Sequence, residues 1–156
     1  AGPAPGGRRM TYVYVASSWR NLIQPGIVAA LRSCGIECYD YKNPVPGQTG
    51  FSWKEIEPDW INWTPQQWRN ALRHPIAQEG YRRDNKAMDD ADCCLLILPS
   101  GRSSHLEAGY MAAQGKPVFV LAIDRVEPDL MVLLFGSPER LLTSMNEMFD
   151  AMGVDN

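Results

Sequence analysis

The sequence predicts an α/β fold: a flavodoxin/Rossmann-like parallel sheet of about five strands, with helices on both faces and a tryptophan-rich insertion. Strand-like apolar segments alternate with helical segments along the chain, which is typical of parallel sheets with right-handed crossovers. Cys93–Leu98 is a continuous apolar run of strand length, as expected of a central strand covered on both faces. Small polar residues and a helical segment follow this run, and ligands bind at such turns in open α/β sheets.

The first half of the chain begins with a strand, a helix and a second strand. Tyr12–Ala16 is rich in aromatic and β-branched residues, which favours a strand. Asn21–Ser33 has apolar residues at helical spacing, Pro25 near its start and Gly35 after its end, which indicates a helix. Ile36–Tyr41 is the predicted second strand.

The segment from Asn43 to Tyr81 is too long for a plain loop in a compact domain. We expect two short helices in it, Pro58–Asn62 and Pro65–Arg73, folded over the edge of the sheet. The segment holds four of the five tryptophans, which are Trp53, Trp60, Trp63 and Trp68. Either at least one of these rings forms the wall of a base-binding pocket, or they form a satellite core under the insertion.

The second half of the chain continues the alternation of helices and strands. We expect a helix around Asp84–Ala91, the strand Cys93–Leu98, a helix over Leu106–Gln114 and the strand Val118–Ile123. A final helix over roughly Ser137–Met152 carries an apolar stripe, which indicates core or a dimer interface.

Composition and charge limit the classes of function. The 156 residues suffice for one domain, which we place at residues 10–156 after a disordered leader at residues 1–9. The net charge of -3, without a basic face, argues against a nucleic-acid partner. No apolar run is long enough to span a bilayer and no signal peptide is visible, so we expect no membrane partner and a cytoplasmic location.

The four cysteines do not have the spacing of a metal site or a redox motif. Cys93 and Cys94 are adjacent in a strand and therefore point to opposite faces of the sheet. We expect buried free thiols of a reducing cytoplasm, with no metal and no cofactor.

Three carboxylates lie around the strand–turn–helix unit: Asp84, Asp92 and Glu107. Two carboxylates that flank one pocket are the groups that glycosyl-bond chemistry needs, and Asp84 with Glu107 is the candidate pair. Each carboxylate also has a structural interpretation. Asp92 suits a turn or cap before the strand, Asp84 suits a helix N-cap, and Glu107 suits a solvated acid in the first helical turn.

Four patches of the chain resemble the nucleoside 2-deoxyribosyltransferase superfamily, which includes 2'-deoxynucleotide N-hydrolases and cytidylate N-glycosidases. Tyr14-Val-Ala-Ser-Ser-Trp19 is similar to the family's Tyr-Phe-Gly-Ala-Gly-Trp turn, and Arg83-Asp84 followed by Asp92 keeps the family's separation of two aspartates. Leu106-Glu-Ala-Gly-Tyr with Gln-Gly-Lys116 matches Met-Glu-Leu-Gly-Tyr…Gln-Gly-Lys. Pro128-Asp-Leu-Met131 matches the Ile-Asn-Leu-Met patch that reaches into a neighbouring subunit's pocket.

The resemblance implies catalytic roles for three residues. Glu107 would attack the anomeric carbon, Asp84 would give or relay a proton to the nucleobase, and Tyr14 would orient Glu107. Asp129, which replaces the family's asparagine, and Met131 would complete the pocket of another protomer. A homodimer or higher homo-oligomer with a shared active site follows from that role.

The turn before Glu107 departs from the family. Position 101 is glycine, where the transferases have an aspartate and the nucleotide hydrolases a serine. This turn would lie at the 5' end of a nucleoside, and a Gly/Ser turn with an arginine at a helix N-terminus favours a 5'-phosphate. Alternatively, the arginine is solvated and a serine caps the helix. The expected substrate-binding residues in the two turns are Ser17, Ser18, Trp19, Gly101, Arg102, Ser103 and Ser104.

Three functions remain open. The first is an enzyme that cleaves or exchanges the N-glycosidic bond of a nucleoside or nucleoside 5'-monophosphate. The second is a TIR-like hydrolase or binder of the nicotinamide dinucleotide, although the Gln114–Lys116 and Asp129–Met131 patches fit the deoxyribosyltransferase pattern better. The third is a non-catalytic nucleotide-sensing module on the same scaffold. The partner in each case is a small nucleoside or nucleotide.

Overall fold

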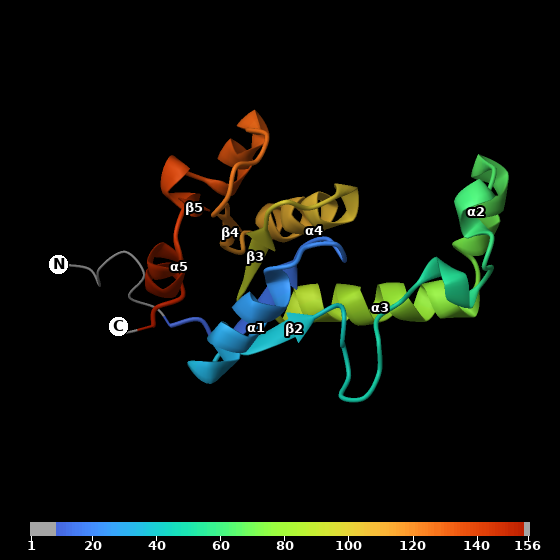
Figure 1. Cartoon of the computed structure of the whole chain (residues 1–156), viewed down its shortest axis with the longest axis horizontal. Coiled ribbons are helices and arrows are strands. Elements are labelled where there is room, and N and C mark those ends of the chain that lie inside the picture. Colours follow the sequence, from blue (N-terminus) through green and yellow to red (C-terminus); the bar gives the residue numbers. More distant parts are fainter. Residues whose placement is uncertain (1–8, 155–156) are drawn as a thin grey trace.

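The computed structural model describes residues 9–154 and contains a five-stranded, fully parallel sheet (Figure 1). The strand order is β2-β1-β3-β4-β5, which is the flavodoxin-like order, and the predicted fold class is thus confirmed. The strands are β1 (Tyr12–Ala16), β2 (Glu37–Asp40), β3 (Cys93–Ile97), β4 (Val118–Leu121) and β5 (Leu141–Leu142). The direction of strand addition reverses between β1 and β3, and this reversal marks the crevice in which such sheets bind ligands.

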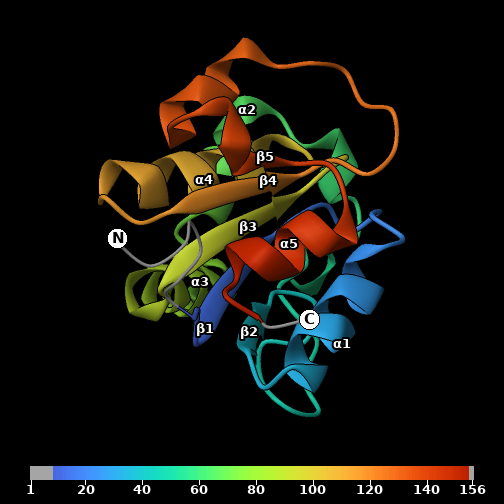
Figure 2. The same cartoon turned by 90° about the vertical axis from the view of Figure 1, so that its left-hand side faces the viewer.

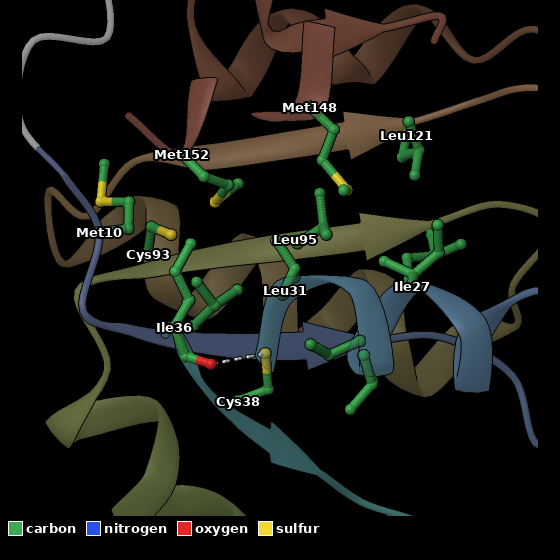
Figure 3. Close-up of a cluster of buried hydrophobic side chains, with 14 of the residues drawn as sticks. Met10, Ile27, Leu31, Ile36, Cys38, Cys93, Leu95, Leu121, Met148 and Met152 are labelled. Carbon is green, nitrogen blue, oxygen red and sulfur yellow. Dashed lines mark hydrogen bonds between the residues drawn. The ribbon is translucent and has the colours of Figure 1, made fainter. Parts of the chain in front are cut away.

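Helices cover both faces of the sheet, as the sequence predicts (Figure 2). The helices α1 (Gln24–Ser33) and α5 (Met145–Ala151) lie on one face, and α3 (Pro75–Asp90) and α4 (Arg102–Ala113) lie on the other. Alternation along β3 sends Cys93 to the first core and Cys94 to the second. Figure 3 shows the first core, in which Leu31 of α1 and Met148 of α5 lie around Leu95 of β3. All four cysteines are free thiols.

The predicted final helix over residues 137–152 is wrong in its first half. The chain forms a short 3-10 turn, η4 (Pro138–Arg140), then β5, and α5 starts only at Met145. Leu141 is more exposed than the buried Leu142, and both pair with β4 in parallel register. The Ser144 hydroxyl accepts a hydrogen bond from the Glu147 N–H, and this cap fixes the start of α5.

Two other helices start earlier than expected. The long helix α3 begins at Pro75, so Asp84 lies in its interior and is not an N-cap. The helix α4 begins at Arg102, so Glu107 lies beyond its first turn and is not a first-turn acid. The leader predicted at residues 1–9 lies outside the described residues except for Arg9, whose guanidinium donates a hydrogen bond to the Cys34 carbonyl.

The insertion contains η1 (Trp53–Glu55), η2 (Trp60–Asn62) and α2 (Pro65–Ala71). Figure 1 shows α2 beyond the N-terminal end of α3 and away from the sheet, so the expectation that it folds over the sheet edge is wrong. The Trp53 ring lies edge-on to Phe51 at 4.8 Å and to Trp63 at 5.5 Å, between ring centroids. A Cβ atom at Gly80 of α3 would lie 3.0 Å from the Phe51 Cβ, so the insertion packs closely on α3 here. These contacts favour the satellite-core interpretation for these rings.

Asp92 has the structural role that the sequence suggests for it. Its Oδ2 accepts hydrogen bonds from the backbone N–H groups of Thr11 and Tyr12, at 2.9 and 3.0 Å, and one from the Thr11 hydroxyl. Asp92 therefore ties the amino end of β3 to the start of β1, at the edge of the sheet opposite the crevice.

Candidate active site

The candidate site begins with a tyrosine in β1 and a glutamate in α4. Tyr14 is fully buried in β1, an interior strand of the sheet, and its side chain belongs to the core on the α3/α4 face. The Tyr14 hydroxyl donates a hydrogen bond to Glu107 Oε2. The early start of α4 makes this contact possible because it places Glu107 in the second turn, on the side of the helix that covers the sheet. The pair lies beside the β1/β3 reversal.

Burial is the main reason why the Glu107 carboxyl is a weaker acid than usual. Loss of solvent foremost, with a smaller contribution from the nearby negative charge of Asp84, raises the pKa of this carboxyl to about 7. The hydrogen bond from Tyr14 opposes the rise, because it stabilises the ionised form. Glu107 thus changes its charge close to neutral pH, which is the range in which a catalytic carboxyl is useful.

Asp84 is the second buried carboxyl, and it has its own tyrosine. The Tyr39 hydroxyl donates a hydrogen bond of 2.6 Å to Asp84 Oδ1. Burial raises the pKa of Asp84, whereas the Tyr39 hydrogen bond and the charge of Arg83 lower it. Sequence reasoning missed Tyr39. The sequence does contain a signal for Tyr39. Tyr39 and Tyr41 lie two residues apart in the predicted strand, so both side chains face the same side of the sheet.

The two tyrosines hold the two carboxyls side by side. Tyr14 and Tyr39 are paired residues of β1 and β2, and their rings stack with centroids 5.3 Å apart and planes inclined by 14°. The charge of Asp84 also contributes to the raised pKa of Tyr14, so Asp84 lies within electrostatic reach of both Tyr14 and Glu107. The structure therefore brings Tyr14, Asp84 and Glu107, the three residues predicted to be catalytic, into one cluster.

The turn after β1 uses two of its three predicted substrate-binding side chains internally. The Ser17 hydroxyl donates to the Ile97 carbonyl at 2.8 Å, and Ser18 Oγ accepts from the Arg20 N–H at 3.1 Å. The Trp19 ring is about half exposed and lies edge-on to Tyr41 at 5.5 Å. Of the three, Trp19 presents the largest free surface for a ligand.

The four residues at the start of α4 divide into two pairs. Gly101 is the N-cap and offers no side chain to the helix, and the buried Ser104 donates its hydroxyl to the Gly101 carbonyl at 2.9 Å. The interpretation of a serine as the helix cap is therefore wrong. Arg102 and Ser103 are exposed. They stand at a helix N-terminus whose first N–H groups lack a side-chain acceptor.

Asp129 and Met131 lie in the 3-10 helix η3 (Leu130–Phe135) and its cap. Asp129 Oδ1 accepts from the Met131 N–H at 2.9 Å. Met131 is 55% exposed, whereas Val132 and Phe135 of the same helix pack against the core that contains Tyr14. The helix η3 thus rests on its own chain and presents Met131 outward.

Two hollows lie on the insertion and not at the carboxyl cluster. One of about 340 Å³ is lined by Trp68, Arg69 and Leu72 among others, and one of about 480 Å³ includes Trp63 and His74. Neither contains Tyr14 or Glu107, so we place the site by its chemistry. Within residues 9–154, no group of three or more His, Cys, Asp or Glu side chains is arranged to hold a metal ion. No helix in this described part of the chain is long and apolar enough to cross a membrane.

The structure is similar to that of a 2-deoxyribosyltransferase from the psychrotolerant bacterium Bacillus psychrosaccharolyticus. The TM-score is 0.54 at 19% sequence identity, and the match covers 93% of each chain. The chain has the 2-deoxyribosyltransferase fold. No protein-family model and no curated protein sequence matches it. At this identity the likeness establishes the fold, and the chemistry of this chain has to be argued from its own side chains.

Proposed function

We propose that this protein is an enzyme that cleaves or exchanges the N-glycosidic bond of a nucleoside or nucleoside 5'-monophosphate, with Glu107 as the nucleophile. The observation that carries the proposal is the pair of buried carboxyls, each held by a tyrosine hydroxyl, beside the β1/β3 reversal. Two carboxyls with raised pKa values in one crevice suit a reaction that needs one nucleophile and one acid. The shared fold with a 2-deoxyribosyltransferase supports nucleoside chemistry.

The first step forms a covalent sugar–enzyme intermediate. In the reactive form the proton of the carboxyl pair lies on Asp84 and Glu107 is ionised. Asp84 gives this proton to a ring nitrogen of the base, the bond between the base and the anomeric carbon breaks, and its electron pair leaves with the base. The Glu107 carboxylate forms a bond to the anomeric carbon. In the second step, water or a second base loses a proton to the Asp84 carboxylate, forms a bond to the same carbon and releases the Glu107 carboxylate, so configuration is retained overall. Tyr14 keeps its own proton, because burial foremost raises its pKa, and holds Glu107 in place.

The 5' end of the substrate fits the start of α4. Arg102 and Ser103 are exposed beside a helix N-terminus that has no side-chain cap. An arginine and free backbone N–H groups suit a phosphate, and this favours a 5'-monophosphate over a free nucleoside. The half-exposed Trp19 would contact the base by stacking, with Ser17 and Ser18 shaping its turn.

We further propose that the active protein is a homo-oligomer in which Asp129 and Met131 complete the pocket of a neighbouring protomer. The outward position of Met131 supports this arrangement, as do the neighbouring exposed side chains of η3, which are Leu130, Leu133 and Leu134. In this proposal residues 10–156 act as one domain of a cytoplasmic protein.

A substrate panel tests the proposed reaction. Purified protein is incubated with nucleosides and nucleoside 5'-monophosphates of both sugars, with and without a second free base, and the released or exchanged base is separated by chromatography. We expect base release or exchange with at least one substrate, and a loss of at least about a thousandfold in Glu107→Gln. The matched control is Glu79→Gln, since Glu79 is exposed and forms only a surface ion pair with Arg82.

Three outcomes would contradict the proposal. No base release by the wild-type protein across the panel argues for a nucleotide-sensing module, and thermal stabilisation by a nucleotide without turnover would support that alternative. Release of nicotinamide from the dinucleotide alone would favour a TIR-like hydrolase. Unchanged base release by Glu107→Gln would exclude Glu107 as the nucleophile.

A further inference from the structure

Tyr39 is the one member of the carboxyl cluster to which the proposed reaction gives no role. Tyr39 as a residue is 8% exposed and its hydroxyl donates to Asp84, which is itself partly exposed, so a substrate would contact Asp84 before Tyr39. The hydroxyl stays a proton donor at working pH, because burial foremost, with help from the hydrogen bond and charge of Asp84, raises the pKa of Tyr39. Within the described residues, Asp84 Oδ2 makes no hydrogen bond. One oxygen of Asp84 is therefore fixed by Tyr39 and the other is free.

We propose that Tyr39 is the positioning residue of the acid Asp84: its hydroxyl holds Oδ1, so that the reactive proton sits on Oδ2 and faces the leaving base. This inference rests on the proposed function. Stacking on Tyr14 fixes the Tyr39 ring, and Tyr14 in turn holds Glu107, so the paired residues of β1 and β2 set the spacing of acid and nucleophile.

The hydrogen bond becomes stronger during the reaction. When the base departs, the Oδ2–H bond of Asp84 breaks, an N–H bond forms on the base, and Asp84 becomes a carboxylate. Tyr39 keeps its proton throughout. A hydrogen bond to an ionised acceptor is roughly twice as strong as one between neutral groups, so Tyr39 stabilises the charge that develops on Asp84.

The other charged groups around Asp84 do not replace this contact. Arg83 lies on the same helix and lowers the pKa of Asp84 as the weakest of the three causes. From the sheet, Tyr39 of β2 contacts Asp84, and the charge of Asp84 raises the pKa values of Tyr14 in β1 and of Glu107 in α4. Of these groups, Tyr39 is the one that donates a hydrogen bond to the Asp84 carboxyl.

The test variant is Tyr39→Phe, which keeps the ring and its stacking and removes only the donor. The matched control is Tyr110→Phe, because the Tyr110 hydroxyl also donates to an aspartate of α3, Asp89 Oδ1 at 3.0 Å, on the exposed surface. Two substrates are compared: an ordinary purine nucleoside or nucleotide from the panel, and its N7-methylated form. The methylated base already carries a positive charge and leaves without a proton.

We expect Tyr39→Phe to lower kcat on the ordinary substrate by about 10- to 100-fold with KM changed less than about threefold, the loss typical of a hydrogen bond to a charged group. On the methylated substrate kcat should stay within about threefold of wild type, since that reaction does not use the Asp84 proton. Tyr110→Phe should leave both rates unchanged. Equal losses on the two substrates, or no loss on either, would overturn the positioning role.

A readout without substrate separates this inference from the proposed function. The Asp84 carboxyl is titrated by carbon NMR in the free protein, and its pKa should rise in Tyr39→Phe and stay constant in Tyr110→Phe. An unchanged Asp84 titration in Tyr39→Phe overturns the inference itself. If the wild-type protein releases base from none of the substrates but the Asp84 titration shifts as expected, the proposed reaction is wrong and Tyr39 nevertheless holds Asp84.

Discussion

Replacing Glu107 by glutamine is expected to make the protein more stable above neutral pH. The side chain is largely buried, and burial raises the pKa of its carboxyl to about 7 from an ordinary value of 4.5. Between these two values the folded protein binds more protons than the unfolded chain, so the free energy of unfolding falls as pH rises through this range and stays low above it. Above about pH 7 the wild-type protein is destabilised by the buried Glu107 carboxylate, whereas the variant has a neutral glutamine there and is not destabilised in this way.

The size of the effect follows from the two pKa values. Their difference corresponds to about 3 kcal/mol, at about 1.4 kcal/mol for each factor of ten. Glutamine still offers a neutral carbonyl oxygen to the Tyr14 hydroxyl, as the protonated Glu107 does, and the stronger hydrogen bond to the ionised form is already contained in the pKa of about 7. The stability difference between Glu107→Gln and wild type should therefore increase by about 2 to 3 kcal/mol between about pH 5 and about pH 8.

Urea unfolding of both proteins at the two pH values measures this difference. Effects of titrating groups far from Glu107 cancel, because they are common to both chains, whereas the coupling to Asp84 is part of the measured difference. For the exposed Glu79→Gln variant, the stability difference from wild type should be the same at the two pH values. A stability difference between Glu107→Gln and wild type that is equal at the two pH values would refute the claim that burial raises the pKa of Glu107.

Three further changes are expected to have defined effects. Tyr14→Phe removes the donor that lowers the pKa of Glu107, so the rise of kcat/KM with pH should move to higher pH, and a pH–rate profile that stays in place would contradict this. Gly50→Ala should lower the free energy of unfolding by about 3 kcal/mol in urea, since its Cβ would lie 1.8 Å from the Tyr41 carbonyl oxygen, and a neutral result would argue against this close approach. Asp92→Ala leaves the N–H groups of Thr11 and Tyr12 without their carboxylate acceptor, so the free energy of unfolding should fall by about 2 to 3 kcal/mol. KM on any panel substrate should stay the same, and a raised KM would place Asp92 at the site.

The parts of the fold that the sequence predicts well carry strong periodic signals. Cys93–Leu98 is apolar throughout because both of its faces are covered, and the structure places Cys93–Ile97 at the centre of the sheet. The contact between Tyr14 and Glu107 could be anticipated from the family resemblance, and the hydrogen bond between them is present. The likeness to a 2-deoxyribosyltransferase structure agrees with the fold that the resemblance implies.

The parts that the sequence does not predict lack a local signal. The N-cap of α4 is Gly101, which has no side chain to form a capping hydrogen bond, so the sequence near Arg102 does not indicate that a helix begins there. The start of α3 is an exception, because Pro75 at its first position is a helix-start signal that the sequence offers. Gly80, whose lack of a side chain serves packing against Phe51, interrupts the pattern further along the helix. The strand Leu141–Leu142 is too short to show alternation, and parallel pairing with β4 makes it a strand.

The contact of Tyr39 with Asp84 depends on long-range geometry. It joins β2 to the interior of α3, and its existence requires the early start of that helix. The position of α2 is likewise decided by the length of α3, which carries the insertion away from the sheet (Figure 1). The alternation of side chains along a strand predicts which face of the sheet Tyr39 lies on, but it does not predict that Tyr39 contacts Asp84.

The central claim is that Glu107 forms a bond to the sugar, and trapping that bond tests it most directly. The protein is mixed with the best substrate of the panel, quenched in acid within the first turnovers, digested and mapped by mass spectrometry. We expect the mass of the sugar on the peptide that contains Glu107, and no such adduct in Glu107→Gln together with loss of base release. A sugar attached to another residue, or base release by Glu107→Gln at the wild-type rate, would contradict the account.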